Sequence, residues 1–543
     1  MSRLDRLERG RKAYAQREWR EAYAYLSFAD LESPLGGVDL ALLADSAYLL
    51  GGEAQSLELL ERAFQFDLHH ELPHNAARCA FWIGFRLRLA GDHVLGDVWL
   101  TRARRQLEEC APCATHGLLL LASGGSHLGA GDAANAAADF SKAFEIGTRF
   151  GDADIATLAR HYQGWAAIRC GRTTEGLAML DESVAKAASG TTAVVAGNVY
   201  CSALDACEET MDVHRAERWL ALLIKWRGAQ PSLVAFRAEA LAHHVSLMTL
   251  RGAWRDALDD LTLLIAWLDE RSDRSDAGLA YYQRGELLRL RGDHDAAEKA
   301  YFEAAKRGHT SQPGLAQLWL AKAQIEKATS EIHRLLRQVS MRQQRAHLLL
   351  PSVEILLAAD RVDDARACAE ELCRLDAELR TPLSYAASTH AIGAVLLYEE
   401  EAEPALVALR DARSGWQELG SLYHAARVQL LIAAAHRNLG NETAVKIELL
   451  AAASEFELLG AAADRLHAEN FYRRNAPADA TFIITRQLEI LRLLALGMSS
   501  AAIAEALAMR ETVVLKETTA IYHQLRASTP GQAVERARGL GLI

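Results

Sequence analysis

The sequence predicts an all-α protein, and three observations lead to this class. Segments such as 280–292 and 295–308 place apolar residues three and four positions apart, which is the spacing of one helix face, and both end on glycine. The 543 residues include only 10 prolines, and alternating runs of β-branched residues are nearly absent. A pattern of small and large residues also recurs about every forty positions. We therefore expect helices that follow one another through short turns.

The repeat consists of a small residue, a large residue four positions later, and a small or apolar residue seven positions later. In the clearest copy these are Ala297, Tyr301 and Ala304. Small residues let one helix approach the next, and the large residue fills the groove between neighbouring pairs. Most copies lie 40 or 41 residues apart, with shorter steps at three places. The twelve copies begin at Ala22, Ser56, Gly96, Ala136, Gly176, Ala216, Ala257, Ala297, Ala328, Ala365, Ala405 and Val445.

This pattern resembles the tetratricopeptide repeat, in which aromatic, glycine, alanine and tyrosine positions follow the order found in residues 281–309. The longer period resembles the extended variant found in large bacterial transcription activators of the MalT type. The resemblance implies a tetratricopeptide-like α–α superhelix over residues 1–470. It also implies a concave groove that holds an unknown small-molecule or protein effector.

Charge and hydropathy exclude several classes of protein. A net charge of −11 argues against a chain that coats nucleic acid or an anionic membrane along its whole length. The charged N-terminal segment has no apolar core of the kind a signal peptide needs, and the longest apolar run, 118–122, is far shorter than the ~20 residues that span a bilayer. Eight scattered cysteines do not form a disulfide framework. We expect a cytoplasmic protein with reduced thiols and no membrane segment.

Two small clusters contain cysteine and histidine, which are residue types that can bind metals. Cys110, Cys113 and His116 form a CxxC motif with a nearby histidine, which suggests either a zinc or redox site or an ordinary loop at a repeat junction. Zinc needs a further ligand, and no second CxxC motif occurs. The preceding inter-repeat loop contains a group of histidines: His69, His70 and His74.

Motifs of enzymes are not found. The chain has no GxxxxGK[ST] loop for nucleotide phosphates and no HExxH zinc motif, and no Ser–His–Asp arrangement stands out. We therefore expect no enzymatic activity, no cofactor and no metal.

The last sixty residues differ from the repeats. Pro477 and its small, polar neighbours predict a linker over 471–481. The segment 482–543 has the outline of a helix-turn-helix, and the balance of its charges is positive by two, opposite in sign to the whole chain. Ser499 and Ser500 are suited to cap the first helix of the motif, and Gly497 and Ala504 to permit close crossing of helices. An inward stripe is expected on its second helix: Val514, Ile521 and Leu525.

This segment resembles the LuxR-type (GerE-like) DNA-binding domain over its whole length, without a gap. The matching features include Arg486 and Glu489 before the first apolar run, Gly497, the pair Ile503–Ala504, and the closing residues 540–543. The resemblance implies a small four-helix domain whose second motif helix enters the major groove of DNA. It also implies a homodimer formed through the last helix, residues 532–540. The residues expected to contact DNA are Ser499, Arg510, Thr512, Lys516, Thr519, His523 and Arg526.

Four positions depart from the family pattern. Val513, Leu515 and Glu517 replace the usual threonine, lysine and histidine, and Gln487 replaces a glutamate. Loss of the lysine removes an expected DNA contact, and Glu517 is expected to bring a negative charge close to the DNA backbone. The apolar Val513 and Leu515 also suit a helix that packs against protein.

Two hypotheses remain open. The first is a LuxR-family transcription regulator that binds promoter DNA and whose repeats sense an effector. The alternative is a tetratricopeptide protein-interaction scaffold whose degenerate helix-turn-helix no longer binds DNA.

Overall fold

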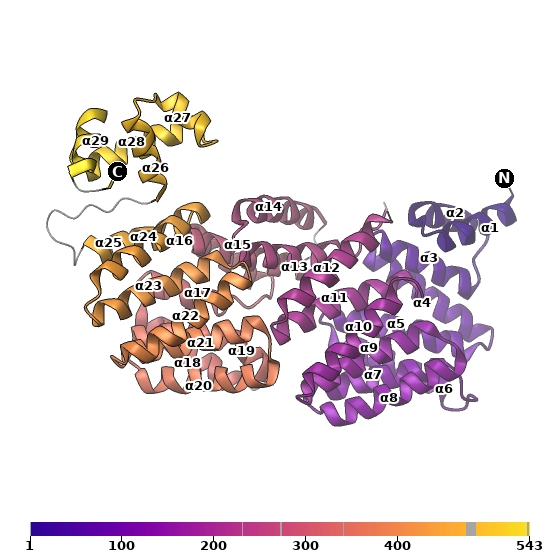
Figure 1. Ribbon diagram of the computed structural model, residues 1–543. Coiled ribbons are helices and arrows are strands. Elements are labelled where there is room, and N and C mark those ends of the chain that lie inside the picture. The colour runs from indigo at the N-terminus through magenta and orange to yellow at the C-terminus, as the bar shows by residue number, and fades with distance from the viewer. Residues whose placement is uncertain (1, 231, 272–273, 340–341, 474–484, 540–541) are drawn as a thin grey trace. The chain divides into compact units, whose positions relative to one another are not determined.

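The computed structural model describes the whole chain except residues 1, 231, 272–273, 340–341, 474–484 and 540–541. Within this described part, every regular element is an α-helix, as the sequence predicts (Figure 1). None of the described helices is long and apolar enough to cross a bilayer. The helices form two compact units, Met1–His244 and Val245–Ile543, so the division falls within the repeats.

The first unit contains twelve complete helices and the start of a thirteenth. They are α1 (Arg3–Ala15), α2 (Trp19–Glu32), α3 (Gly37–Leu49), α4 (Glu53–His69), α5 (Pro73–Leu89), α6 (His93–Leu107), α7 (Thr115–Gly129), α8 (Ala133–Phe150), α9 (Ala153–Arg169), α10 (Thr173–Ala187), α11 (Ala193–Thr210), α12 (Val213–Gly228) and α13 (Arg237–Leu250). Aspartate side chains cap several of them, as Asp152 does by accepting the backbone N–H of Ile155 at 3.0 Å.

The second unit continues the repeats and adds the C-terminal helices. The repeat helices are α14 (Trp254–Arg271), α15 (Arg274–Arg291), α16 (His294–Lys306), α17 (Gly314–Ala321), α18 (Ile325–Gln338), α19 (Arg342–Ala358), α20 (Val362–Leu379), α21 (Pro382–Tyr398), α22 (Ala402–Glu418), α23 (Leu422–Asn438), α24 (Glu442–Leu459) and α25 (Ala462–Arg473). The C-terminal helices are α26 (Thr485–Ala495), α27 (Ser500–Ala506), α28 (Glu511–Gln524) and α29 (Pro530–Gly539).

The predicted repeat corresponds to a series of helix pairs. All twelve copies of the small–large–small pattern lie on the even-numbered helices from α2 to α24. Their first residues are buried except Ala216, which is partly exposed. Ala328 and Ala365, where the spacing is irregular, are both fully buried, and the short helix α17 lies in the step of 31 residues. The chain is thus a tetratricopeptide-like array of helix pairs.

A glycine on the first helix of a pair allows close contact with the large residue of the second. A β-carbon on Gly124 would lie 2.4 Å from the ring of Phe140, and one on Gly164 would lie 3.0 Å from the Leu180 side chain. In both pairs the glycine precedes the large residue by sixteen positions. The same spacing and the same close contact occur in four more pairs: Gly10–Leu26, Gly84–Leu100, Gly285–Tyr301 and Gly393–Leu409. Six pairs therefore depend on the absence of a side chain at one position.

Each unit also contains contacts between its early and late helices. In the first unit the segment before α13 returns to α3, where the N–H groups of Val234 and Ala235 both donate to the carbonyl oxygen of Leu49, at 2.8 and 3.1 Å. In the second unit Trp254 of α14 packs edge-on against Tyr423 of α23, with ring centroids 5.4 Å apart. These contacts join elements that are more than 150 residues apart in sequence.

The predicted linker is only partly within the described residues. Helix α25 continues to Arg473, so the first residues of the segment 471–481 are helical and the linker prediction is wrong there. The remainder of that segment lies outside the described residues.

Adjacent glycines in α7 offer a matched test of helix-pair packing. Gly124→Ala should lower the free energy of unfolding by about 1–3 kcal/mol, because the new methyl group would overlap the Phe140 ring. Gly125 has open space around it, so Gly125→Ala should leave stability unchanged or raise it by up to about 1 kcal/mol. Urea unfolding followed by circular dichroism measures both. Equal effects of the two substitutions would contradict this account of pair packing.

Candidate DNA and partner surfaces

The C-terminal helices α26–α29 form a core of their own. Val514 and Ile521 of α28 and Leu525, which follows its last residue, are buried as the sequence predicts, and they pack with Ile490 of α26 and Ile503 of α27. Ala533 and Ala537 add the inner face of α29. This core fixes which side of α28 faces outward.

Tight turns lie on both sides of α27. The Ser499 hydroxyl accepts the backbone N–H of Ala502 at 3.3 Å, so this side chain caps α27 as expected. Ala508 adopts a left-handed conformation with φ +51°, and the N–H of Met509 returns to the carbonyl of Ala504 at 2.8 Å. Gly497 has φ +76° and open space around it, so its role is to allow a left-handed turn, and the predicted role in close helix crossing is wrong.

Six of the seven residues that the sequence singles out for DNA contact lie on α28 or next to its ends, whereas Ser499 caps α27. Thr512, Lys516, Thr519 and His523 are separated by four, three and four positions and are all exposed, so they line one face of α28. Arg510 occupies the position before α28, and the exposed Arg526 follows its C-terminus. We name this surface the α28 face; it consists of Arg510, Thr512, Leu515, Lys516, Thr519, His523 and Arg526.

Glu517 does not lie on the α28 face. Its side chain is buried, with the residue 7% exposed, and one carboxylate oxygen accepts the amide Nε2 of Gln487 at 2.9 Å. The other oxygen accepts Nη2 of Arg486 at 2.9 Å. The expectation that Glu517 brings a negative charge close to DNA is therefore wrong, because the carboxylate points inward and is paired. Two of the departures from the family pattern, Gln487 and Glu517, bind each other.

Leu515 is the departure that does alter the α28 face. Its side chain is 49% exposed between Thr512 and Thr519, whereas Val513 is partly buried. The surface thus combines basic and polar groups with one apolar side chain. Sequence inspection did not identify Arg486 as the partner that holds α28 in place, since the two interacting positions lie 31 residues apart.

Charged side chains on the odd-numbered helices of the second unit are bound to each other. Arg427 of α23 donates to Glu354 of α19 at 3.1 Å, and this carboxylate raises the pKa of Arg427. Tyr423 donates its hydroxyl proton to Asp464 of α25 at 3.2 Å. Burial lowers the pKa of the adjacent His424 to about 3, so this imidazole is neutral at physiological pH. Arg427, Glu354, Tyr423 and Asp464 are thus each hydrogen-bonded within the chain.

An apolar and basic surface lies on the outer side of α6. Val94 is 80% exposed, and Leu95 and Val98 are each more than 40% exposed. The exposed Arg102, Arg104 and Arg105 continue the helix, and none of the three has an acidic partner among the described residues. We name these six residues the α6 surface. Arg102 lies over the ring of Trp99, with its guanidinium carbon 4.4 Å from the ring centroid.

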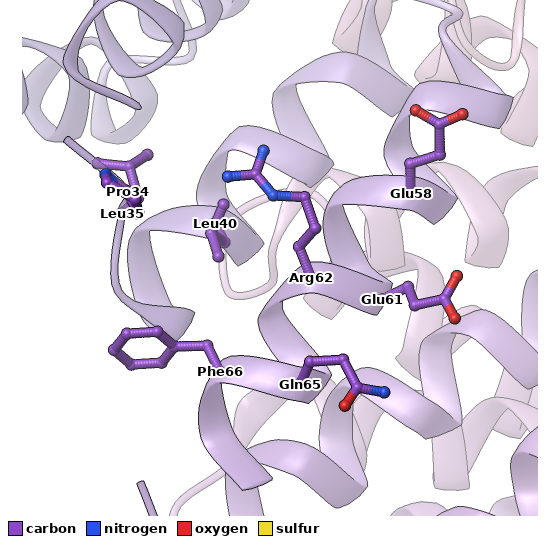
Figure 2. A pocket seen from close by; sticks show the side chains of 8 residues that line it. All are labelled: Pro34, Leu35, Leu40, Glu58, Glu61, Arg62, Gln65 and Phe66. Carbon is purple, nitrogen blue, oxygen red and sulfur yellow. The ribbon is translucent and has the colours of Figure 1, made fainter. Parts of the chain in front are cut away.

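A hollow of about 530 Å³ lies between the segment before α3 and the outer side of α4 (Figure 2). Pro34, Leu35, Leu40 and Phe66 line it, and Arg62 is bound to Asp30 at 2.8 Å. Glu58, Glu61 and Gln65 complete its rim. Because the cation on its rim is already paired, the hollow offers an apolar floor with an acidic edge.

The structure brings the two predicted Cys/His clusters together. The sulfur of Cys113 lies 3.4 Å from Nδ1 of His74 and 3.4 Å from Nδ1 of His116. Cys110 instead donates to the carbonyl of Gln106 at 3.1 Å. In the sequence His74 and Cys113 lie about one repeat of forty residues apart. That separation is the signal from which their contact could have been predicted. Within the described residues, no group of three or more His, Cys, Asp or Glu side chains is arranged to hold a metal ion.

The chain is only weakly similar to known proteins. No family model matches the chain, and no curated protein matches it. A chain of the APC/C hetero-tetramer Cut9–Hcn1 is 13% identical, with 88% of this chain and 95% of that chain covered and a TM-score of 0.42. Yeast Tom70 is 12% identical, with coverage of 87% and 95% and a TM-score of 0.26. At these scores neither protein supports an inference about partners or activity.

Removal of the Glu517 carboxylate tests its structural role. Glu517→Ala should lower the local stability of α28 by about 1.5–3 kcal/mol, because Arg486 and Gln487 lose a charged acceptor. Hydrogen exchange of α28 amides in the full chain should then be at least about tenfold faster. The exposed Glu535→Ala in α29 is the control and should change exchange little. Unchanged exchange in Glu517→Ala would show that the carboxylate does not hold α28.

Proposed function

We propose that the chain is a protein-interaction scaffold and that a partner docks on the α6 surface. The observation that carries this proposal is the combination of exposed Val94, Leu95 and Val98 with three arginines that lack acidic partners among the described residues. Adjacent apolar and basic groups on one helix match a partner helix with an apolar stripe and acidic flanks. A partner of this chemistry would bury the valines and pair the arginines.

The arrangement of charges elsewhere supports the choice of an outer surface. In the second unit Arg427 is already bound to Glu354, and Tyr423 is bound to Asp464. A partner would have to break those bonds to use these side chains. Arginine is also enriched at the centres of protein interfaces, where its planar group stacks and forms several hydrogen bonds. The α6 surface offers such groups without a competing acidic partner among the described residues.

A paired substitution tests the α6 surface. Val98→Asp combined with Arg102→Glu should weaken binding of the partner at least about tenfold, because it removes apolar contact and reverses a charge. The control is Val407→Asp combined with Arg410→Glu, since both residues are exposed on the outer side of α22. Partners captured from cells by the wild-type chain are purified and their affinities are measured by calorimetry. Equal affinity of both double variants and the wild type would exclude this surface.

DNA binding by the α28 face is a second candidate function. The specific observation in its favour is that Thr512, Lys516, Thr519 and His523 all lie on one exposed face, while the acidic Glu517 is withdrawn into the core. A helix that presents such a face in a helix-turn-helix enters the major groove in LuxR-type domains, which this segment resembles. Arg510 and Arg526 would then contact phosphates at the two ends of α28.

Salt dependence tests the DNA-binding candidate. Fluorescence anisotropy with labelled duplex from upstream of the chain's own gene should show saturable binding that weakens as salt rises, because phosphate contacts release counterions. Lys516→Ala should reduce the slope of log affinity against log salt by about 1. Lys142→Ala, an exposed position on α8, should leave the slope unchanged. Absent or salt-independent binding by the wild-type chain would exclude this candidate.

A further inference from the structure

Cys113 lies where the N-terminal ends of two helices meet. His74 is the second residue of α5 and His116 is the second residue of α7. Each imidazole has its Nδ1 atom 3.4 Å from the half-buried Cys113 sulfur. Helix N-termini stabilise a negative charge, because their first backbone N–H groups have no partner within the helix and the positive end of the helix dipole lies there. Two imidazoles, each from the first turn of a helix, thus lie beside one thiol.

The two histidines have different hydrogen-bond roles. Nδ1 of His116 accepts the backbone N–H of Cys113 at 3.2 Å, so that lone pair is engaged and the His116 proton resides on Nε2. Within the described part of the chain Nδ1 of His74 has no other hydrogen bond, which leaves it as the acceptor for the thiol proton. His74 is also exposed, so a small molecule can reach this side of the sulfur.

We propose that Cys113 is a reactive thiol that hydroperoxides oxidise to a sulfenic acid, with His74 moving the proton. The thiol proton passes to Nδ1 of His74, which leaves a thiolate. The thiolate attacks the terminal peroxide oxygen, an S–O bond forms, and the O–O bond breaks. The leaving oxygen takes the proton from His74 and departs as an alcohol, or as water from hydrogen peroxide. Sulfur loses two electrons and the peroxide gains them.

Three other cysteines serve for comparison: Cys79, Cys170 and Cys368. Burial raises the pKa of the Cys79 thiol to about 12 and that of Cys368 to about 11, which keeps both protonated at neutral pH. Cys170 is exposed, and no imidazole of the described residues is hydrogen-bonded to its sulfur. It is therefore an internal reference for a thiol that is accessible but has no proton acceptor. Among these cysteines, oxidation is expected at Cys113, in the segment between α6 and α7.

Competitive labelling tests the proposal. The full chain is treated with dilute hydrogen peroxide in the presence of dimedone, which traps sulfenic acids, and each cysteine is quantified by mass spectrometry. Cys113 should be labelled at least about tenfold faster than Cys170. His74→Asn should reduce the labelling of Cys113 towards that of Cys170, whereas His69→Asn, at the exposed last residue of α4, should have no effect. Labelling of Cys113 no faster than Cys170, or unaffected by His74→Asn, would overturn the proposal.

A second measurement follows the alkylation of cysteines in the wild-type chain alone. Iodoacetamide reacts with thiolates and requires no oxidant, so it reports the nucleophile separately from the peroxide step. In the wild-type chain at pH 7, Cys113 should be alkylated at least about tenfold faster than Cys170, although it is the less exposed of the two. Slower alkylation of Cys113 than of Cys170 would show that the sulfur is held as an unreactive thiol and would refute the proposal.

Discussion

Close packing of two helices within each pair is the contact on which the rest of the array depends. A large side chain such as Phe140 or Tyr301 occupies the space left by a glycine sixteen residues earlier. Both members of the contact are buried, so the pair forms a small core of its own. Pairs of this kind bury little surface alone and must stack on their neighbours, which extends the core along the chain.

Stacking at a nearly constant period places equivalent positions of successive pairs side by side. His74 and Cys113 meet because they lie near the starts of α5 and α7, one repeat apart. Arg427 and Glu354 meet across two repeats, at 73 residues of separation. Side-chain groups that are scattered in the sequence thus collect at the ends and along the sides of the array. The reactive thiol and the paired charges are both products of this spacing.

In the C-terminal helices, the effect of a departure from the family pattern depends on whether the side chain is buried or exposed. Glu517 and Gln487 each depart from the family pattern that the segment resembles, and each taken alone suggests lost function. In the fold the two side chains bind each other at 2.9 Å, and Arg486 completes the pairing. The change therefore alters how α28 is held against α26, while its exposed face keeps Lys516 and His523. Only Leu515 changes the chemistry of that face.

The sequence by itself determined the helical class, the period of the pairs and the inward stripe of α28, including Val514 and Ile521. These features depend on local periodicity, because burial of one helix face imposes a spacing that is visible within a few turns. Tertiary structure alone decided that Glu517 is buried against Arg486 and Gln487, and that Gly497 serves a left-handed turn. Each of these depends on an approach between helices or on a backbone angle. Neither leaves a periodic trace in the chain, so only the packed structure fixes them.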